Sequence, residues 1–133
     1  MNLLIMGKPG AGKGTLAAQL LDYYKLKHIS TGNIYRDEMA KRSPIGLEAE
    51  KYIAAGELVP DEMTNDIVKD VLRAGGFPNG FMLDGYPRTT AQAVALDEIL
   101  AGIDDRLTAV INIDVSDEVL LQRMAGRRVC PAC

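Results

Sequence analysis

The chain has 133 residues, of which 47% are hydrophobic and 25% are charged, an ordinary composition for a globular domain. Its 18 acidic residues outnumber its 15 lysines and arginines, and the net charge of -3 argues against general binding to nucleic acids or anionic membranes. No apolar run approaches the roughly 18 to 20 residues that a membrane-spanning helix needs. Residues 1–6 lack the basic lead of a signal peptide, and both cysteines lie near the last residue, so we expect a cytoplasmic protein without a disulfide scaffold.

The first half of the chain alternates short apolar runs with longer amphipathic stretches, a pattern that predicts βαβ units and a parallel sheet. Residues 3–6 are continuously apolar, as expected for a strand covered on both faces. In chain order, we expect a strand at residues 3–6, a helix after the glycine-rich turn at 7–14, a short strand at 28–29, a helix to about residue 41 capped by Ser30 or Thr31, and a helix at 47–55 that starts after the breakers Pro44 and Gly46.

The same alternation continues through the second half, and the whole chain therefore predicts an α/β fold in which helices flank the sheet. Glycines and prolines mark the turns between its elements. In chain order, we expect a helix capped by Asp61, a strand at residues 81–83 that ends in Asp84, a helix opened by residues 87–90, a strand at 109–113, and a helix capped by Ser116.

Residues 7–15, with the sequence GKPGAGKGT, have the spacing of a phosphate-binding P-loop. Glycines permit a tight turn whose backbone N–H groups point at phosphate oxygens, and the following helix adds its N-terminal partial charge. Lys13 can reach the outer phosphates as a compact cation, and Thr15 can offer its hydroxyl to Mg²⁺ or to a phosphate. A glycine-rich turn that binds nothing is the alternative, but an apolar strand before it and an amphipathic helix after it favour the P-loop.

Several polar side chains have a functional and a structural interpretation. Asp84 ends an apolar strand, where a Walker-B carboxylate would hold Mg²⁺ directly or through water; the alternative is a turn or helix cap. Arg123 and Arg127 are four residues apart in a predicted helix, so they are expected to share a face that suits a phosphate chain, or else a solvated basic face. Gln92 can read a base edge through its amide, or it is an exposed helix position.

Five segments together resemble the adenylate kinase family, of the bacterial type with a zinc-bearing lid. They are GKPGAGKGT at 7–15, HISTG at 28–32, GELVP at 56–60, DGYPRT at 84–89 and GRRVCPAC at 126–133. The resemblance implies a P-loop nucleoside-monophosphate kinase fold. It also implies a cytoplasmic monomer that transfers a phosphoryl group reversibly from ATP to AMP, giving two ADP, with Mg²⁺.

The resemblance further divides the chain into three parts. Residues 1–29 and 60–125 form the core domain, residues 30–59 form the AMP-binding segment, and residues 126–133 begin a lid. Because the sequence stops halfway through the lid motif, we expect a truncated chain of low activity, without further lid arginines, the remaining zinc ligands, and a last strand and helix.

The resemblance assigns a role to each residue at a matching position. The residues that act on the transferring phosphoryl group are Lys13, Arg88 and Arg123. The residues that bind ATP are Gly10, Ala11, Gly12, Lys13, Gly14, Thr15, Arg123 and Arg127. The residues that bind AMP are Thr31, Arg36, Glu57, Leu58, Val59, Gly85, Tyr86, Pro87, Arg88 and Gln92. The residues near metal ions are Asp84, which holds Mg²⁺ through water, and Cys130 and Cys133, which supply two of the four ligands of a structural zinc ion.

Some positions depart from the family pattern or stay outside it. Asn33 stands where many members carry aspartate, and Lys8 where a small or apolar residue is common. His28, the single histidine, is interpreted as a packed or surface side chain, because a phosphate acceptor is already an anion and needs no general base. The cations interpreted as solvated surface are Lys8, Arg42, Arg73, Arg106 and Arg128.

A kinase for another nucleoside monophosphate and an inactive nucleotide-binding fragment are the alternative functions. A nucleotide-dependent switch of the GTPase kind is disfavoured, because the chain has no Asn-Lys-x-Asp segment to read guanine.

Overall fold

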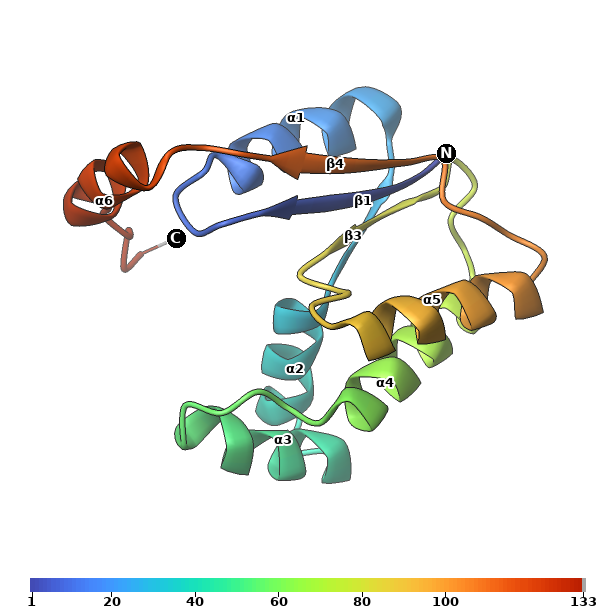
Figure 1. Cartoon of the computed structure of the whole chain (residues 1–133). Helices are drawn as coiled ribbons and strands as arrows, with labels where there is room; N and C mark the ends of the chain where they lie inside the picture. Colours follow the sequence, from blue (N-terminus) through green and yellow to red (C-terminus); the bar gives the residue numbers. More distant parts are fainter. Residues whose placement is uncertain (133) are drawn as a thin grey trace.

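The computed structural model describes residues 1–132, and within this range it has one parallel four-stranded sheet with the strand order β2-β3-β1-β4 (Figure 1). The α/β class expected from the sequence is confirmed. The strands are β1 (Asn2–Gly7), β2 (Lys27–Ser30), β3 (Phe81–Asp84) and β4 (Ala109–Ile113). The helices are α1 (Lys13–Tyr24), α2 (Thr31–Ala40), α3 (Pro44–Ala54), α4 (Asp61–Ala74), α5 (Thr90–Gly102) and α6 (Asp117–Gly126).

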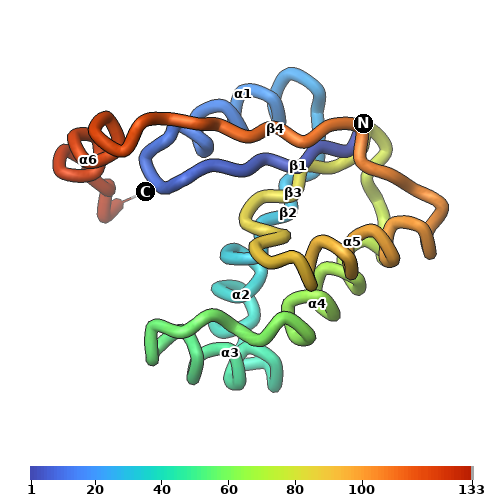
Figure 2. The backbone as a smooth tube through the Cα atoms, in the orientation of Figure 1, coloured from blue at the N-terminus to red at the C-terminus, as the bar shows by residue number. Residues whose placement is uncertain are grey.

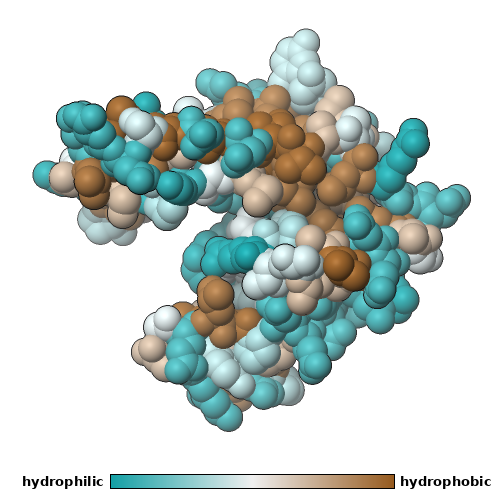
Figure 3. All heavy atoms as spheres, in the orientation of Figure 1, coloured by the Kyte–Doolittle hydropathy of each residue, from teal (hydrophilic) through white to brown (hydrophobic). Residues whose placement is uncertain are grey.

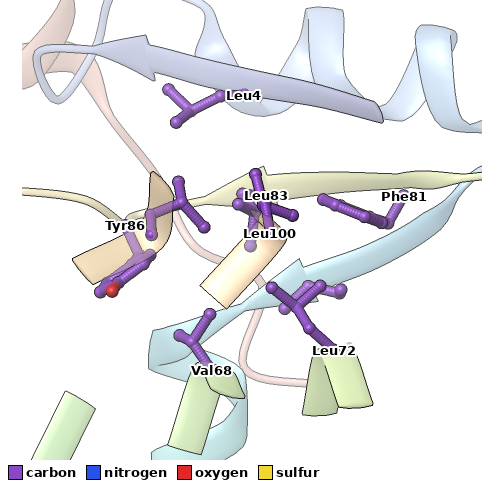
Figure 4. Close-up of a cluster of buried hydrophobic side chains, with 9 residues drawn as sticks. Leu4, Val68, Leu72, Phe81, Leu83, Tyr86 and Leu100 are labelled. Atoms are coloured by element: carbon purple, nitrogen blue, oxygen red, sulfur yellow. The ribbon is translucent and has the colours of Figure 1, made fainter. Parts of the chain in front are cut away.

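The two faces of the sheet pack on different helices, which explains why Leu3, Leu4 and Ile5 are all apolar, whereas Met6 at the end of the run is exposed. Leu4 points into a core with side chains of α4 and α5, among them Val68 and Leu100 (Figure 4). Its neighbours Leu3 and Ile5 point to the opposite face, into the core beside α1. Successive side chains of a strand alternate between faces, so a strand covered on both faces has no polar positions to alternate with.

Helices α2 and α3 pack side by side at the end of the sheet where β2 ends (Figure 2). The expectation that Pro44 and Gly46 break the chain before a helix at 47–55 was wrong, because α3 already begins at Pro44. The side chain of Ser43 caps this helix by accepting a hydrogen bond from the Gly46 backbone N–H at 3.0 Å. Proline is favoured at the first helical position, where its missing N–H costs nothing.

Of the three later helix starts, one differs from the sequence prediction and two agree with it. Asp61 does not cap α4; Pro60 occupies the cap position, and Asp61 is the first helical residue. Helix α5 begins at Thr90, within the segment 87–90 that was predicted to open it, and the Thr89 hydroxyl fixes the cap by accepting a hydrogen bond from the Gln92 backbone N–H at 3.1 Å. Ser116 occupies the cap position of α6 but makes no side-chain cap hydrogen bond.

The molecule is hollowed on one side, between the part that carries α6 and the part that carries α2 and α3 (Figure 3). Hydrophilic residues line much of this hollow in the space-filling view. None of the helices formed within residues 1–132 has the length and apolar character needed to span a membrane.

We predict that Gly46→Ala destabilises the fold. A Cβ at Gly46 would collide with the backbone carbonyl of Glu38, which cannot move without shifting α2 against α3. The free energy of unfolding, measured by urea denaturation, should fall by about 1–3 kcal/mol, as for other overpacked positions. Gly102→Ala is the matched control, since no heavy atom lies within 4 Å of the Cβ it adds. Equal stabilities for the two variants would contradict the close contact of α2 and α3.

Candidate functional site

The glycine-rich segment at residues 7–15 forms the turn between β1 and α1. Gly10 and Gly12 have φ values of 84° and 98°, in the left-handed region that glycine adopts without strain. Gly12 occupies the cap position of α1 and brings no side chain to the first N–H groups of this helix. Those N–H groups therefore form an anion-binding surface of the kind seen at helix N-termini.

Asp84 joins three elements of the site. Its carboxylate accepts a hydrogen bond from the Nζ of Lys13, and its other oxygen lies 3.1 Å from the Nε2 of His28. Burial raises the pKa of Asp84, but the hydrogen bonds and positive charge of Lys13 and His28 outweigh burial and hold the pKa below 3.8. The ionised carboxylate thus positions the lysine of the glycine-rich turn.

His28 is the site residue that sequence reasoning missed. In the parallel register of β2 and β3, His28 pairs with Met82, two residues before Asp84, so both polar side chains lie on the same face of the sheet. A signal was present, because the carboxyl ends of parallel strands meet at one edge of a sheet. The register that brings His28 to Asp84 could not be read from either strand alone.

Helix α6 packs against the glycine-rich turn. The Arg123 guanidinium donates to the backbone oxygens of Gly10 at 3.2 Å and Ala11 at 3.4 Å. Lys8, expected at the solvated surface, forms an exposed ion pair with Asp117 at 2.9 Å. These contacts place the Arg123 cation beside the anion-binding surface.

Arg127 does not share a helix face with Arg123, contrary to expectation. Helix α6 ends at Gly126, and Arg127 has extended backbone angles. The four-residue spacing therefore does not place Arg127 on the same helix face as Arg123. Both arginines nevertheless line one cleft of about 1000 Å³ with the glycine-rich turn, and Arg128, expected at the surface, lines it too. The predicted ATP residues that line this cleft are Gly10, Gly12, Lys13, Gly14, Thr15, Arg123 and Arg127, whereas Ala11 is buried beneath it.

A second cavity, of about 380 Å³, lies between the segment at residues 31–59 and the turn after β3. The Arg36 guanidinium lines it and donates to the side-chain oxygen of Asn33. The Thr31 hydroxyl donates to the Gly85 backbone oxygen at 3.3 Å. The predicted AMP residues in this cavity are Thr31, Arg36, Glu57, Leu58, Val59, Gly85, Arg88 and Gln92.

Gly85 and Arg88 line both spaces, so the turn after β3 is their common wall. The Arg88 side chain is held there by a hydrogen bond from its Nε to the Gly85 backbone oxygen at 2.9 Å. Pro87 lines only the first cleft, and it follows a cis peptide bond. The exposed Arg88 cation is therefore placed to contact a ligand in either space.

Tyr86 and Gln92, both predicted to bind AMP, are buried. The Tyr86 side chain is 2% exposed and packs in the core; burial, with the Asp61 charge, raises its pKa to about 12. Its hydroxyl donates to the Asn65 side-chain oxygen at 2.6 Å. Gln92, at 5% exposure, is not the exposed helix position that was the alternative to base reading, and its amide bonds to Asp61 and to the Arg88 backbone.

The described residues do not build a zinc site. Within residues 1–132 no group of three or more histidine, cysteine, aspartate or glutamate side chains is placed to hold a metal ion. Cys130 is exposed, and Cys133, the other predicted ligand, lies outside the described residues. A closed structural zinc site needs four ligands.

The parallel sheet, the glycine-rich turn and the lysine held by a strand-end carboxylate define an α/β protein of the P-loop kinase class. A family model described as adenylate kinase matches residues 5–129. The chain therefore belongs to the adenylate kinase family, as its motifs indicated.

Curated relatives carry the same name. An adenylate kinase of Limosilactobacillus reuteri is 53% identical over 133 residues, all of this chain and 61% of the relative. Adenylate kinases of Enterococcus faecalis and Clostridium botulinum are 51% and 50% identical over the whole chain, which covers 62% of each. The chain thus spans about three fifths of the length of the relatives it matches.

We predict that the free energy of unfolding depends less on pH in Asp84→Asn than in the parent chain. Because the folded-state pKa of Asp84 lies below 3.8, its charge stabilises the fold above that pH, and this contribution is lost as the pH falls through the depressed value. At pH 7 the variant should lose about 1–3 kcal/mol of unfolding free energy, because Lys13 loses its charged partner and His28 loses a carboxylate hydrogen-bond partner.

Urea denaturation at pH values from 7 to 3 measures this effect. The difference between the parent chain and Asp84→Asn should shrink below about pH 4, as the parent carboxylate takes up its proton. Asp66→Asn, an exposed position on α4, is the control. A difference that stays constant across this range would contradict the pairing.

Proposed function

We propose that this chain is the nucleotide-binding core of an adenylate kinase, which transfers the γ-phosphoryl group of ATP to AMP and runs in both directions. A phosphate oxygen of AMP attacks the γ-phosphorus, the bond to the bridging oxygen breaks, and both products are ADP. No proton has to move, so the residues position the two anions and neutralise their charge. The shared name of the relatives supports this acceptor over another nucleoside monophosphate.

The observation that carries the proposal is the wall shared by the two spaces. ATP would lie in the larger cleft, with its phosphates on the glycine-rich turn and the cations of Lys13, Arg123 and Arg127 around them. AMP would lie in the smaller cavity, with its phosphate near Arg36. Arg88 faces both, so it can contact the phosphoryl group as it passes between the nucleotides.

Asp84 fits a role in holding Mg²⁺, since hard cations prefer carboxylate oxygen and the carboxyl group stays ionised here. Both its oxygens already have partners, which favours contact through water over direct ligation. The ion would neutralise charge on the ATP phosphates when bound. Thr15, which lines the larger cleft, would offer a hydroxyl oxygen to the same ion.

Further properties belong to the same proposal. We infer a cytoplasmic, monomeric enzyme with a core at residues 1–29 and 60–125, an AMP-binding segment at 30–59 and a lid that begins at residue 126. A half site for structural zinc at Cys130 and Cys133 goes with that lid. Zinc there would have a structural role and no part in the transfer, because the proposed anion sites are at the glycine-rich turn and the loop after β3.

Paired variants test the assignment of the two spaces. We predict that Lys13→Ala weakens ATP binding by about tenfold to a hundredfold, the worth of a hydrogen bond to a charged group, and leaves AMP binding nearly unchanged. Arg36→Ala should do the reverse. Calorimetric titration of each nucleotide into each variant measures both effects. Either change should also weaken the binding of an analogue in which five phosphates join two adenosines.

Lys25→Ala is the control, since Lys25 is an exposed cation paired with Asp22 at the end of α1. It should bind both nucleotides like the parent chain. A parent chain that releases no heat with the two-adenosine analogue, or a Lys13→Ala variant that binds it equally well, would overturn the kinase assignment.

A further inference from the structure

Asp61 connects the start of α4 to the start of α5 through side-chain hydrogen bonds. Its carboxylate accepts a hydrogen bond from the Nε2 of Gln92 at 2.8 Å and another from the Thr89 hydroxyl at 3.1 Å. Gln92 is buried and lines the smaller cavity. Asp61 therefore holds a side chain that faces the acceptor site.

The chemistry of the partners sets the orientation of the Gln92 amide. A carboxylate only accepts hydrogen bonds, so the amide nitrogen must face Asp61. The Arg88 backbone N–H only donates, and it points at the Gln92 Oε1 at 2.7 Å. Turning the amide over would set oxygen against the Asp61 carboxylate and NH₂ against N–H. The orientation is therefore locked at both ends.

After these internal bonds, the amide keeps one N–H and one oxygen lone pair to offer. A 6-aminopurine presents a donor, its amino group, beside an acceptor, the ring N1. A 6-oxopurine presents the reverse, an acceptor oxygen beside a ring N–H. With the phosphate held near Arg36 and Arg88, the purine has one orientation in the cavity. Each orientation of the Gln92 amide then matches either the 6-aminopurine or the 6-oxopurine, and not both.

We propose that Asp61 is a specificity-determining residue, which locks the Gln92 amide in the orientation that reads a 6-aminopurine and rejects a 6-oxopurine. This inference rests on the proposed function, in which the smaller cavity takes the acceptor nucleotide. Asp61 does not touch the base; it acts through Gln92. An isosteric amide at position 61 can present either oxygen or NH₂, so it removes the lock at this end and leaves the Arg88 backbone N–H alone to hold the orientation.

Calorimetric titration of AMP and inosine monophosphate, which exchanges the purine amino group for oxygen, tests this proposal. In Asp61→Asn, the preference for AMP over inosine monophosphate should fall by about tenfold, the worth of one hydrogen bond to a charged group. Glu62→Gln is the matched control, because it removes the same charge one residue later in the first turn of α4, at an exposed position. It should keep the parent preference.

Each other outcome has a definite meaning. If Asp61→Asn weakens both nucleotides by the same factor, Asp61 only supports the fold and the proposal is overturned. If Glu62→Gln lowers the preference as much as Asp61→Asn, the effect is one of general charge, and the proposal is equally wrong. If the parent chain does not bind AMP, the proposed function itself fails, which is visible before any variant is compared.

A measurement on the parent chain covers the case in which Asp61→Asn does not fold. In nuclear magnetic resonance spectra, the side-chain NH₂ protons of Gln92 should show Overhauser contacts to the Cβ protons of Asp61. Contacts from these NH₂ protons to the Arg88 backbone N–H, without contacts to Asp61, would place the amide the other way round and overturn the proposal.

Discussion

A partly buried carboxylate at the end of a central strand organises the site. Burial alone would raise the pKa of Asp84, and the charged form is favoured only because Lys13 and His28 supply hydrogen bonds and positive charge. These three side chains come from β3, α1 and β2, so the interaction also fixes how the helix after the glycine-rich turn meets the sheet. The P-loop lysine is thereby placed in the cleft before any anion binds.

The parallel sheet explains why the other site residues gather at the same place. All strands point the same way, so the turns after β1 and β3 lie at one edge of the sheet. Helix α6, which follows β4, reaches the same edge and brings Arg123 onto the glycine-rich turn. A net acidic protein can concentrate cations in this manner, because its topology brings separate loops together.

The acceptor side of the site is built by hydrogen bonds inside the protein as much as by the cavity lining. The loop after β3 is tied back on itself by Arg88 and Gly85, and to α4 through Gln92 and Asp61. Such internal bonds reduce the rotamer freedom that a ligand would otherwise have to restrict. A buried amide with both ends engaged is therefore a pre-organised recognition group, and its partners matter for selectivity as well as stability.

Much of this molecule could be predicted from local pattern. The P-loop, the apolar strands and the carboxylate after β3 each depend on a few neighbouring residues, and β4 at 109–113 was predicted to the residue. Helix starts were less accurate: Pro44 and Gly46 were interpreted as breakers, although a serine cap and a proline at the first position begin α3 there. Proline and glycine can end one helix or lie in the first turn of the next, so the residue type alone does not tell which of the two applies.

Contacts between distant segments could not be predicted in this way. The pairing of His28 with Asp84 spans 56 residues and depends on strand register, and the bond from Gln92 to Asp61 spans 31 residues and depends on how α5 packs against α4. Motif spacing was enough to name the chemistry, because phosphate binding by a glycine-rich turn is a local property of the backbone. Partners for the buried polar groups were settled by packing, since a buried donor or acceptor bonds to whatever the fold brings within reach.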